Sequence, residues 1–70
     1  MNPRPTDEEL SGLTTNERLW ACGLGPEFEA AAKARKKEEM VAVLAQLAFT
    51  RDQATEVAEK ILANPAYYGF

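Results

Sequence analysis

The sequence predicts an all-α protein, a small compact bundle of three to four short helices. Apolar residues recur at helical spacing through the second half of the chain. No stretch alternates apolar and polar residues as a half-buried strand would. Helix start and stop signals flank the apolar runs. With 70 residues, the chain has room for one domain.

The N-terminal residues 1–12 are expected to form a flexible arm, and residues 13–70 a single helical domain with an aromatic C-terminal tail. Two prolines and three consecutive acidic residues in the arm oppose a regular buried helix. Thr6 and Glu9 nevertheless have the spacing of a capping box, which predicts a single turn that ends at Gly12.

The first helix of the domain is expected to begin at Thr14 or Thr15. Thr14 and Glu17 are spaced so that the hydroxyl accepts the third amide and the carboxylate reaches back to the cap. Gly23 is suited to a left-handed stop. This helix is therefore short, about two turns.

The second predicted helix opens at Gly25-Pro26, because proline fits the first helical position, where its missing N–H loses nothing. Its apolar stripe includes Phe28 and lapses in the basic stretch that follows. Two interpretations stay open, a break near Arg35–Lys37 or one continuous helix to Ala48. We favour the break, because Phe28 and the later stripe need different partners, although the stretch has no glycine or proline.

The third predicted helix, residues 38–48, is apolar on nearly all sides and must be covered by several neighbours. The fourth follows a capping box of Thr50 and Gln53 and ends at Asn64-Pro65, since a residue before proline is pushed out of the helical region. The predicted centre of the core consists of Val43, Leu44, Leu47, Val57, Ile61 and Leu62.

The C-terminal tail, residues 66–70, carries three of the six aromatic residues. It is expected to fold back over the third helix or Trp20, because a chain this short needs its aromatics in the core. The alternative is that the aromatic residues anchor a partner or a second subunit, since aromatics are enriched at interface centres. The candidate partner-binding residues are Trp20, Phe28, Tyr67, Tyr68 and Phe70.

Catalytic chemistry is sparse in this sequence. There is no histidine, and Cys22 is the one cysteine, so a disulfide within the chain and a structural zinc site are both excluded. Cys22 is expected to be a small buried hydrophobe near a helix C-terminus. Acid pairs such as Glu38 with Glu39 and Glu56 with Glu59 are expected on solvated faces. We therefore expect no enzyme, no cofactor and no metal.

The net charge of −3 argues mildly against general affinity for nucleic acid or anionic lipid. No segment resembles a signal peptide, and the longest apolar stretch, residues 40–49, is too short to span a bilayer core of about 30 Å. A lone cysteine fits a reducing compartment. A cytoplasmic protein without a membrane partner is expected.

A helix-turn-helix-like nucleic-acid-binding regulator is the alternative function. The third and fourth predicted helices would form the motif, and the basic cluster after the second helix would contact phosphates. Against this, Glu56 and Glu59 would face phosphates, and the basic cluster is better explained as a solvated helix end. The candidate nucleic-acid contacts are Lys33, Arg35, Lys36, Lys37, Arg51 and Gln53.

The chain after Leu10 resembles small proteobacterial proteins of similar length that have no assigned activity. The resemblance is carried by Asn16-Glu17-Arg18-Leu19 near the start and by Ile61-Leu62-Ala63-Asn64-Pro65 with Tyr68-Gly69 at the end, a pattern of the form NERL…ILANPxxYG. It implies a bacterial cytosolic setting and assigns no functional residue.

The first functional hypothesis is therefore a non-catalytic protein-interaction module, a small adaptor or regulator. Self-association stays open, because domains of fewer than about 70–80 residues commonly need a staple and this chain lacks the usual ones.

Overall fold

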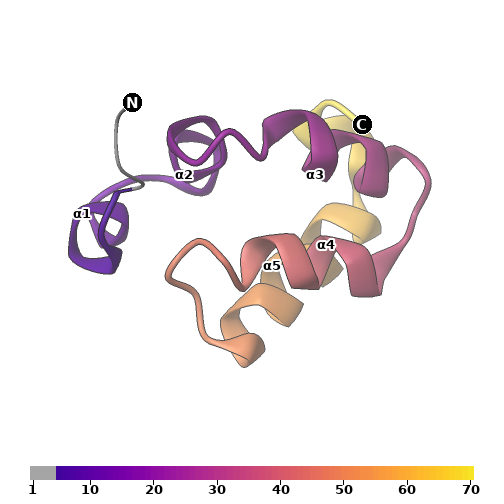
Figure 1. The fold of residues 1–70 in the computed structure, drawn as a ribbon. Helices are drawn as coiled ribbons and strands as arrows, with labels where there is room; N and C mark the ends of the chain where they lie inside the picture. The colour runs from indigo at the N-terminus through magenta and orange to yellow at the C-terminus, as the bar shows by residue number, and fades with distance from the viewer. Residues whose placement is uncertain (1–4) are drawn as a thin grey trace.

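The computed structural model describes residues 5–70, and all regular structure within them is helical (Figure 1). This confirms the all-α class. A fifth helix is present in addition to the predicted three to four, because a short helix also forms within the predicted arm. The elements are α1 (Asp7–Ser11), α2 (Thr15–Ala21), α3 (Gly25–Lys33), α4 (Lys37–Leu44), α5 (Arg51–Ala63) and a 3-10 helix (Pro65–Tyr68).

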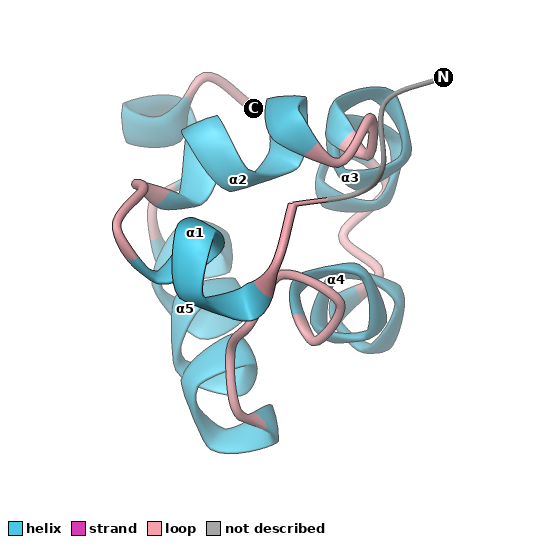
Figure 2. Ribbon diagram, turned by 60° about the vertical axis from the view of Figure 1, so that its left-hand side comes forward, coloured by secondary structure: helices cyan, strands magenta, loops and turns pink. Residues whose placement is uncertain are grey.

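Two pairs of helices form the two sides of the molecule. In both views α2 and α3 lie on one side and α4 and α5 on the other (Figures 1 and 2). Helix α4 packs against both α3 and α5, and the 3-10 helix packs against the end of α5. The radius of gyration is 11.5 Å, close to the value of about 11 Å expected for a compact chain of this length. The short loops between α3 and α4 and between α4 and α5 thus join helices that are neighbours in space.

Three of the helices begin with a capping box, as the spacing of their first residues predicts. Thr6, Thr14 and Thr50 each accept the N–H of the residue three positions later, and a side chain at that position accepts the N–H of the threonine. At α2 the Thr14 N–H donates to Glu17 Oε1 over 2.9 Å. The hydrogen bonds from Thr14 lower the pKa of Glu17, because they stabilise its charged form.

Helices α2 and α3 end in the same way, with a residue in the left-handed region. Gly23 at the end of α2 has φ of 69°, as predicted, and Arg35 at the end of α3 has φ of 59°. In each case the next residue donates its N–H back to a carbonyl five positions earlier, which satisfies the open end of the helix. The Arg35 guanidinium adds a 2.7 Å hydrogen bond to the Ala32 carbonyl. The predicted break near Arg35–Lys37 is confirmed.

The end predicted for the third helix is wrong. Helix α4 stops at Leu44 rather than Ala48, because the next two turns are closed by tighter bonds, from Gln46 N–H to the Val43 carbonyl and from Leu47 N–H to the Leu44 carbonyl. Ala48 then has φ of 64°, a left-handed conformation that reverses the chain towards α5. Apolar residues continue past the helix end because Leu47 remains fully buried in the turn.

Ala48→Gly is expected to stabilise the protein. A side chain in the left-handed region costs about 1–2 kcal/mol, part of which is offset because glycine loses more freedom on folding. We expect the free energy of unfolding to rise by about 0.5–1 kcal/mol, measured by urea denaturation. The matched control is Ala42→Gly on the exposed side of α4, where the same chemical change should lower it by about 1 kcal/mol. A loss of stability in Ala48→Gly would contradict the strain assigned to this turn.

The core lies between the two helix pairs and includes most of the predicted centre. Four of the six predicted residues are buried, whereas Val57 and Leu62 are half-buried and pack against the edge. The main cluster also contains residues that the prediction placed outside its centre, and α2 and α3 supply several of them. The buried cluster comprises Leu19, Phe28, Ala31, Ala32, Met40, Val41, Val43, Leu44, Leu47, Ala54, Ala58 and Ile61.

Part of the predicted arm is folded. Thr6 caps α1, and Gly12 ends it, as the capping-box spacing indicated. Leu10 within α1 is fully buried, although it lies outside the main core cluster. The first four residues of the predicted arm, with Pro3, lie outside the described residues.

Candidate interaction surface

A mostly apolar groove with a volume of about 380 Å³ opens between α2, α5 and the C-terminal tail. This volume lies within the range of about 300–1,000 Å³ that is typical of ligand sites. Buried residues from three helices form its floor, and more polar residues of α2 and α5 form its rim. We call it the aromatic groove; it is lined by Thr15, Asn16, Leu19, Phe28, Val57, Lys60, Ile61, Tyr68 and Phe70.

The C-terminal tail forms one wall of the aromatic groove. Pro65 starts the 3-10 helix, and Gly69, with φ of 87°, turns the chain so that the Phe70 N–H donates to the Pro65 carbonyl. The Phe70 ring then packs edge-on against Phe28, with ring centroids 5.9 Å apart. The end of the tail therefore folds back onto the bundle, as expected, but its ring contact is with Phe28 of α3 and not with the predicted third helix or Trp20.

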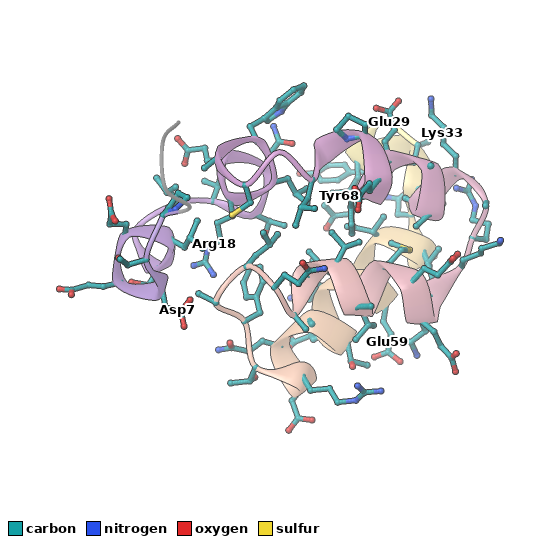
Figure 3. All side chains as sticks on the ribbon, in the orientation of Figure 1. Asp7, Arg18, Glu29, Lys33, Glu59 and Tyr68 are labelled. Atoms are coloured by element: carbon teal, nitrogen blue, oxygen red, sulfur yellow. The ribbon has the colours of Figure 1, made fainter. Side chains whose placement is uncertain are left out.

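Two tyrosines of the tail do not fold inward. Tyr67 is 78% exposed and Tyr68 is 44% exposed, and their rings contact each other edge-to-face with centroids 5.0 Å apart. Figure 3 labels Tyr68, which lies behind α3 at the side of the molecule where the tail returns. The tail is thus divided between the two roles considered for it: Phe70 contributes to packing, whereas Tyr67 and Tyr68 remain at the surface.

Trp20 is the third large exposed apolar side chain and is 69% exposed. It lies on α2 one turn after Asn16, which lines the aromatic groove. The indole packs against Gly25: a Cβ atom added at this glycine would lie 3.8 Å from the nearest ring atoms of Trp20. The ring is therefore held at the surface of its own chain rather than inserted into the core.

Phe28 does not lie on the surface, contrary to its selection as a candidate partner-binding residue. It is 2% exposed and belongs to the core cluster. The sequence pattern could not show this, because the side chain is covered by Phe70 and by residues of other helices that are distant along the chain. Of the other four candidate partner-binding residues, Tyr68 and Phe70 line the aromatic groove. Tyr67 lies in the tail, and Trp20 lies on α2 one turn after Asn16.

The basic cluster is neutralised by neighbouring acids. Its three lysines each form an ion pair: Lys33 with Glu29 at 2.8 Å, Lys36 with Glu39 at 3.7 Å and Lys37 with Glu59 at 2.7 Å. Arg35 is bonded to carbonyls of Ala32 and Phe70. A phosphate would therefore meet a nearby carboxylate at each of these three lysines.

The other candidate nucleic-acid contacts lie at the start of α5. Arg51 and Gln53 are both exposed. Gln53 is already used in the capping box, where its Oε1 accepts the Thr50 N–H over 2.9 Å. Glu56 and Glu59 follow on exposed positions of the same helix, as predicted. The two sets of candidate contacts come from different helices, and acidic side chains accompany both.

Arg18 is a buried cation that sequence reasoning missed. Its side chain points from α2 towards the turn between α4 and α5 (Figure 3), and the residue is 9% exposed. The guanidinium donates to three backbone carbonyls, of Leu13 at 3.1 Å, Leu47 at 3.0 Å and Ser11 at 3.3 Å. It also lies 4.2 Å from the centroid of the Phe49 ring. Among residues 5–70 no carboxylate forms an ion pair with it.

The role of Arg18 is to join segments that no single helix connects. The carbonyls of Ser11 and Leu13 precede α2, whereas the Leu47 carbonyl and the Phe49 ring belong to the turn after α4. No local spacing distinguishes such an arginine from one on a solvated face. The only indirect signal was its position next to Leu19 on a helix with a buried side.

The described chain offers few groups for chemistry. Cys22 caps the end of α2 and is half-buried beside the core. Residues 5–70 contain no group of three or more cysteine, aspartate or glutamate residues placed to hold a metal ion. In the same residues every buried side-chain polar atom has a hydrogen-bond partner. No helix in this part of the chain is long and apolar enough to cross a membrane.

Comparison with known proteins adds no relative: no protein-family model matches the chain, and neither the curated proteins nor the solved structures include a significant match.

Proposed function

We propose that this protein is a small non-catalytic protein-interaction module that binds its partner around the aromatic groove. The observation that carries the proposal is the placement of two exposed aromatic side chains: Tyr68 lines an apolar groove, and Trp20 lies on α2 one turn after Asn16, which also lines it. Tryptophan and tyrosine are over-represented among the residues that dominate binding energy at protein interfaces. Such a module would act as an adaptor or regulator in the cytoplasm.

The surface composition supports a protein partner more than a nucleic acid. Among the described residues, each lysine forms an ion pair with a nearby glutamate, and Arg18 is buried. Nucleic-acid binding draws its affinity from cations that are available to phosphates. Apolar contact at the aromatic groove has no such requirement.

The test is partner capture that depends on the groove. The chain is immobilised and exposed to a bacterial lysate, beside a Trp20→Ala/Tyr68→Ala variant and a control variant, Gln46→Ala, whose exposed side chain lies away from the groove. We expect a protein that the native chain and the control retain and the double variant loses. Far-UV circular dichroism checks that all three chains stay helical.

If every captured protein is retained by the double variant, and the native chain does not associate with itself, the proposed function is wrong. Retention on random-sequence duplex at about 50 mM salt, where phosphate contacts are strong, would favour the nucleic-acid alternative instead.

A further inference from the structure

Helix α2 carries both a wall of the aromatic groove and an aromatic side chain that its own chain leaves uncovered. Thr15, Asn16 and Leu19 line the groove. Trp20 lies one turn beyond Asn16 on the adjoining strip of the helix surface, since residues four apart are neighbours. One helix of seven residues thus carries both part of the groove lining and an exposed anchor next to it.

We propose that the aromatic groove receives Trp20 of a second copy of this chain, so that two copies form a twofold-symmetric dimer. The inference rests on the proposed function and names its partner. In a twofold contact the same patch is used by both chains, so each patch must contain the anchor and its receptor together. The adjacency of Trp20 and the aromatic groove on α2 meets this requirement.

The size and chemistry of the groove fit an indole. Its floor is formed by Leu19, Phe28 and Ile61, all buried and apolar, and Tyr68 stands at its edge as an aromatic partner. A buried tryptophan removes about 150–250 Å² from water, the largest such gain of any side chain. Trp20 is 69% exposed in one chain, so most of this area is still available for burial by a partner.

The charges at the contact are complementary. Lys60 has the one charged side chain among the described residues that line the groove. The helix that would enter the groove carries Glu17 one turn before Trp20. Glu17 Oε1 accepts the Thr14 N–H in the capping box, and the exposed carboxylate has a second oxygen for Lys60 of the other copy. The existing partner of Lys60, Glu56, is 3.3 Å away, and both side chains are about two-thirds exposed. Such a surface pair contributes little, so Lys60 exchanges partners at small cost.

A second copy would also compensate for the small hydrophobic core of so short a chain. A domain of this length buries only about 60% of the surface that its unfolded chain exposes. There is no disulfide within the chain, because Cys22 is its one cysteine. Association of two copies adds buried apolar surface and thereby raises the stability of each, as binding to the folded state always does.

Trp20 is the one tryptophan of the chain, so its fluorescence reports the contact directly. Emission and sedimentation are followed from about 1 µM to about 1 mM, a range that covers weak interfaces, at about 0.15 M salt to screen the like net charge of two copies. We expect a blue shift of the emission to accompany the change from one to two chains. A single-chain mass and unchanged emission at the highest concentration overturn the inference.

Two variants locate the contact. Trp20→Ala removes the anchor and is expected to weaken association at least about 30-fold, as loss of a dominant interface residue does. Asn16→Glu places a carboxylate in the path of the indole, and an acid in the first turn of α2 suits the helix end. It should abolish the blue shift. The control Gln46→Ala should associate like the native chain; equal association of Trp20→Ala overturns the inference.

A mixture of these two variants tests whether Trp20 of one chain enters the aromatic groove of the other. The Trp20→Ala chain keeps its groove and contains no tryptophan, whereas the Asn16→Glu chain keeps its tryptophan and has a blocked groove. Adding the first to the second should shift the emission to the blue, because one of the two contacts is restored. No shift up to about 1 mM contradicts insertion into the groove. If the native chain is monomeric but a lysate partner is lost with the groove variants, the second copy is wrong and the proposed function stands.

Discussion

Arg18→Met is expected to lower the free energy of unfolding by about 3 kcal/mol, because one buried and two partly buried carbonyls lose their donor, and a buried acceptor left without a donor costs about 1–3 kcal/mol. The guanidinium donates to the carbonyls of Ser11, Leu13 and Leu47 and stacks on Phe49. Methionine fills a similar volume but donates nothing. Urea denaturation monitored by circular dichroism measures the loss.

This expectation differs from the usual result for a buried ion pair, whose replacement by apolar residues is often neutral. There both charges are removed together, whereas here the acceptors are backbone carbonyls that remain after the substitution. Arg51→Met is the matched control, since Arg51 is exposed at the start of α5, and its effect should stay within about 0.5 kcal/mol. A loss in Arg18→Met no greater than that of the control would show that Arg18 does not join these segments.

Arg18→Lys distinguishes the contribution of the positive charge to stability from that of the planar guanidinium donors. Lysine keeps the positive charge but has a compact ammonium in place of the planar fork of donors. It cannot reach the carbonyls before α2 and the Leu47 carbonyl after α4 at once, so we expect a loss of stability smaller than that of Arg18→Met. Hydrogen exchange should then be fastest around residues 11–13 and 45–49, where the bonds are lost. Uniform acceleration over the whole chain would contradict a local role.

Leu44→Ala is the second substitution with a large expected effect. Leu44 is fully buried in α4, the helix that packs against both α3 and α5. Truncation of such a leucine costs about 2–5 kcal/mol, through lost burial and the cavity that remains. Stabilities of about 0.05–0.15 kcal/mol per residue are usual, so this single change removes a large part of the total. Thermal unfolding should show a fall in Tm of at least about 10 °C.

Leu62→Ala provides the comparison, because Leu62 is half-buried at the edge of the same core. Its solvent-facing position allows water to fill the space that the side chain leaves, so we expect a loss of about 1 kcal/mol. If Leu44→Ala and Leu62→Ala were equally destabilising, the central position of α4 in the packing would be wrong.

Signals confined to a few neighbouring residues correctly predict where most helices begin and end. The three capping boxes, the left-handed stop at Gly23 and the end of α5 before Pro65 all depend on residues within one or two turns of each other. The break before α4 was also anticipated, although the residue that makes it, Arg35, has no obvious preference for the left-handed region. The end of α4 was missed, because the apolar pattern continues into a buried turn.

The contacts that define the candidate surface cannot be predicted from signals between neighbouring residues. The burial of the aromatic residues is decided by tertiary packing. The returning tail places Phe70 over Phe28, while Tyr67 and Trp20 stay exposed. The groove itself exists only where α2, α5 and the tail meet. Arg18 illustrates the limit most clearly, since its acceptors lie up to 29 positions away along the chain.

The sequence by itself thus determined the helical class, most helix boundaries and the apolar faces, because caps and periodicity act between residues one to four positions apart. Only the tertiary structure decided that Arg18 is buried, that Phe28 is core and that Trp20 stands beside a groove. Those outcomes depend on how helices distant in sequence pack, and packing is a property of side-chain shapes meeting across the whole chain rather than of any local spacing.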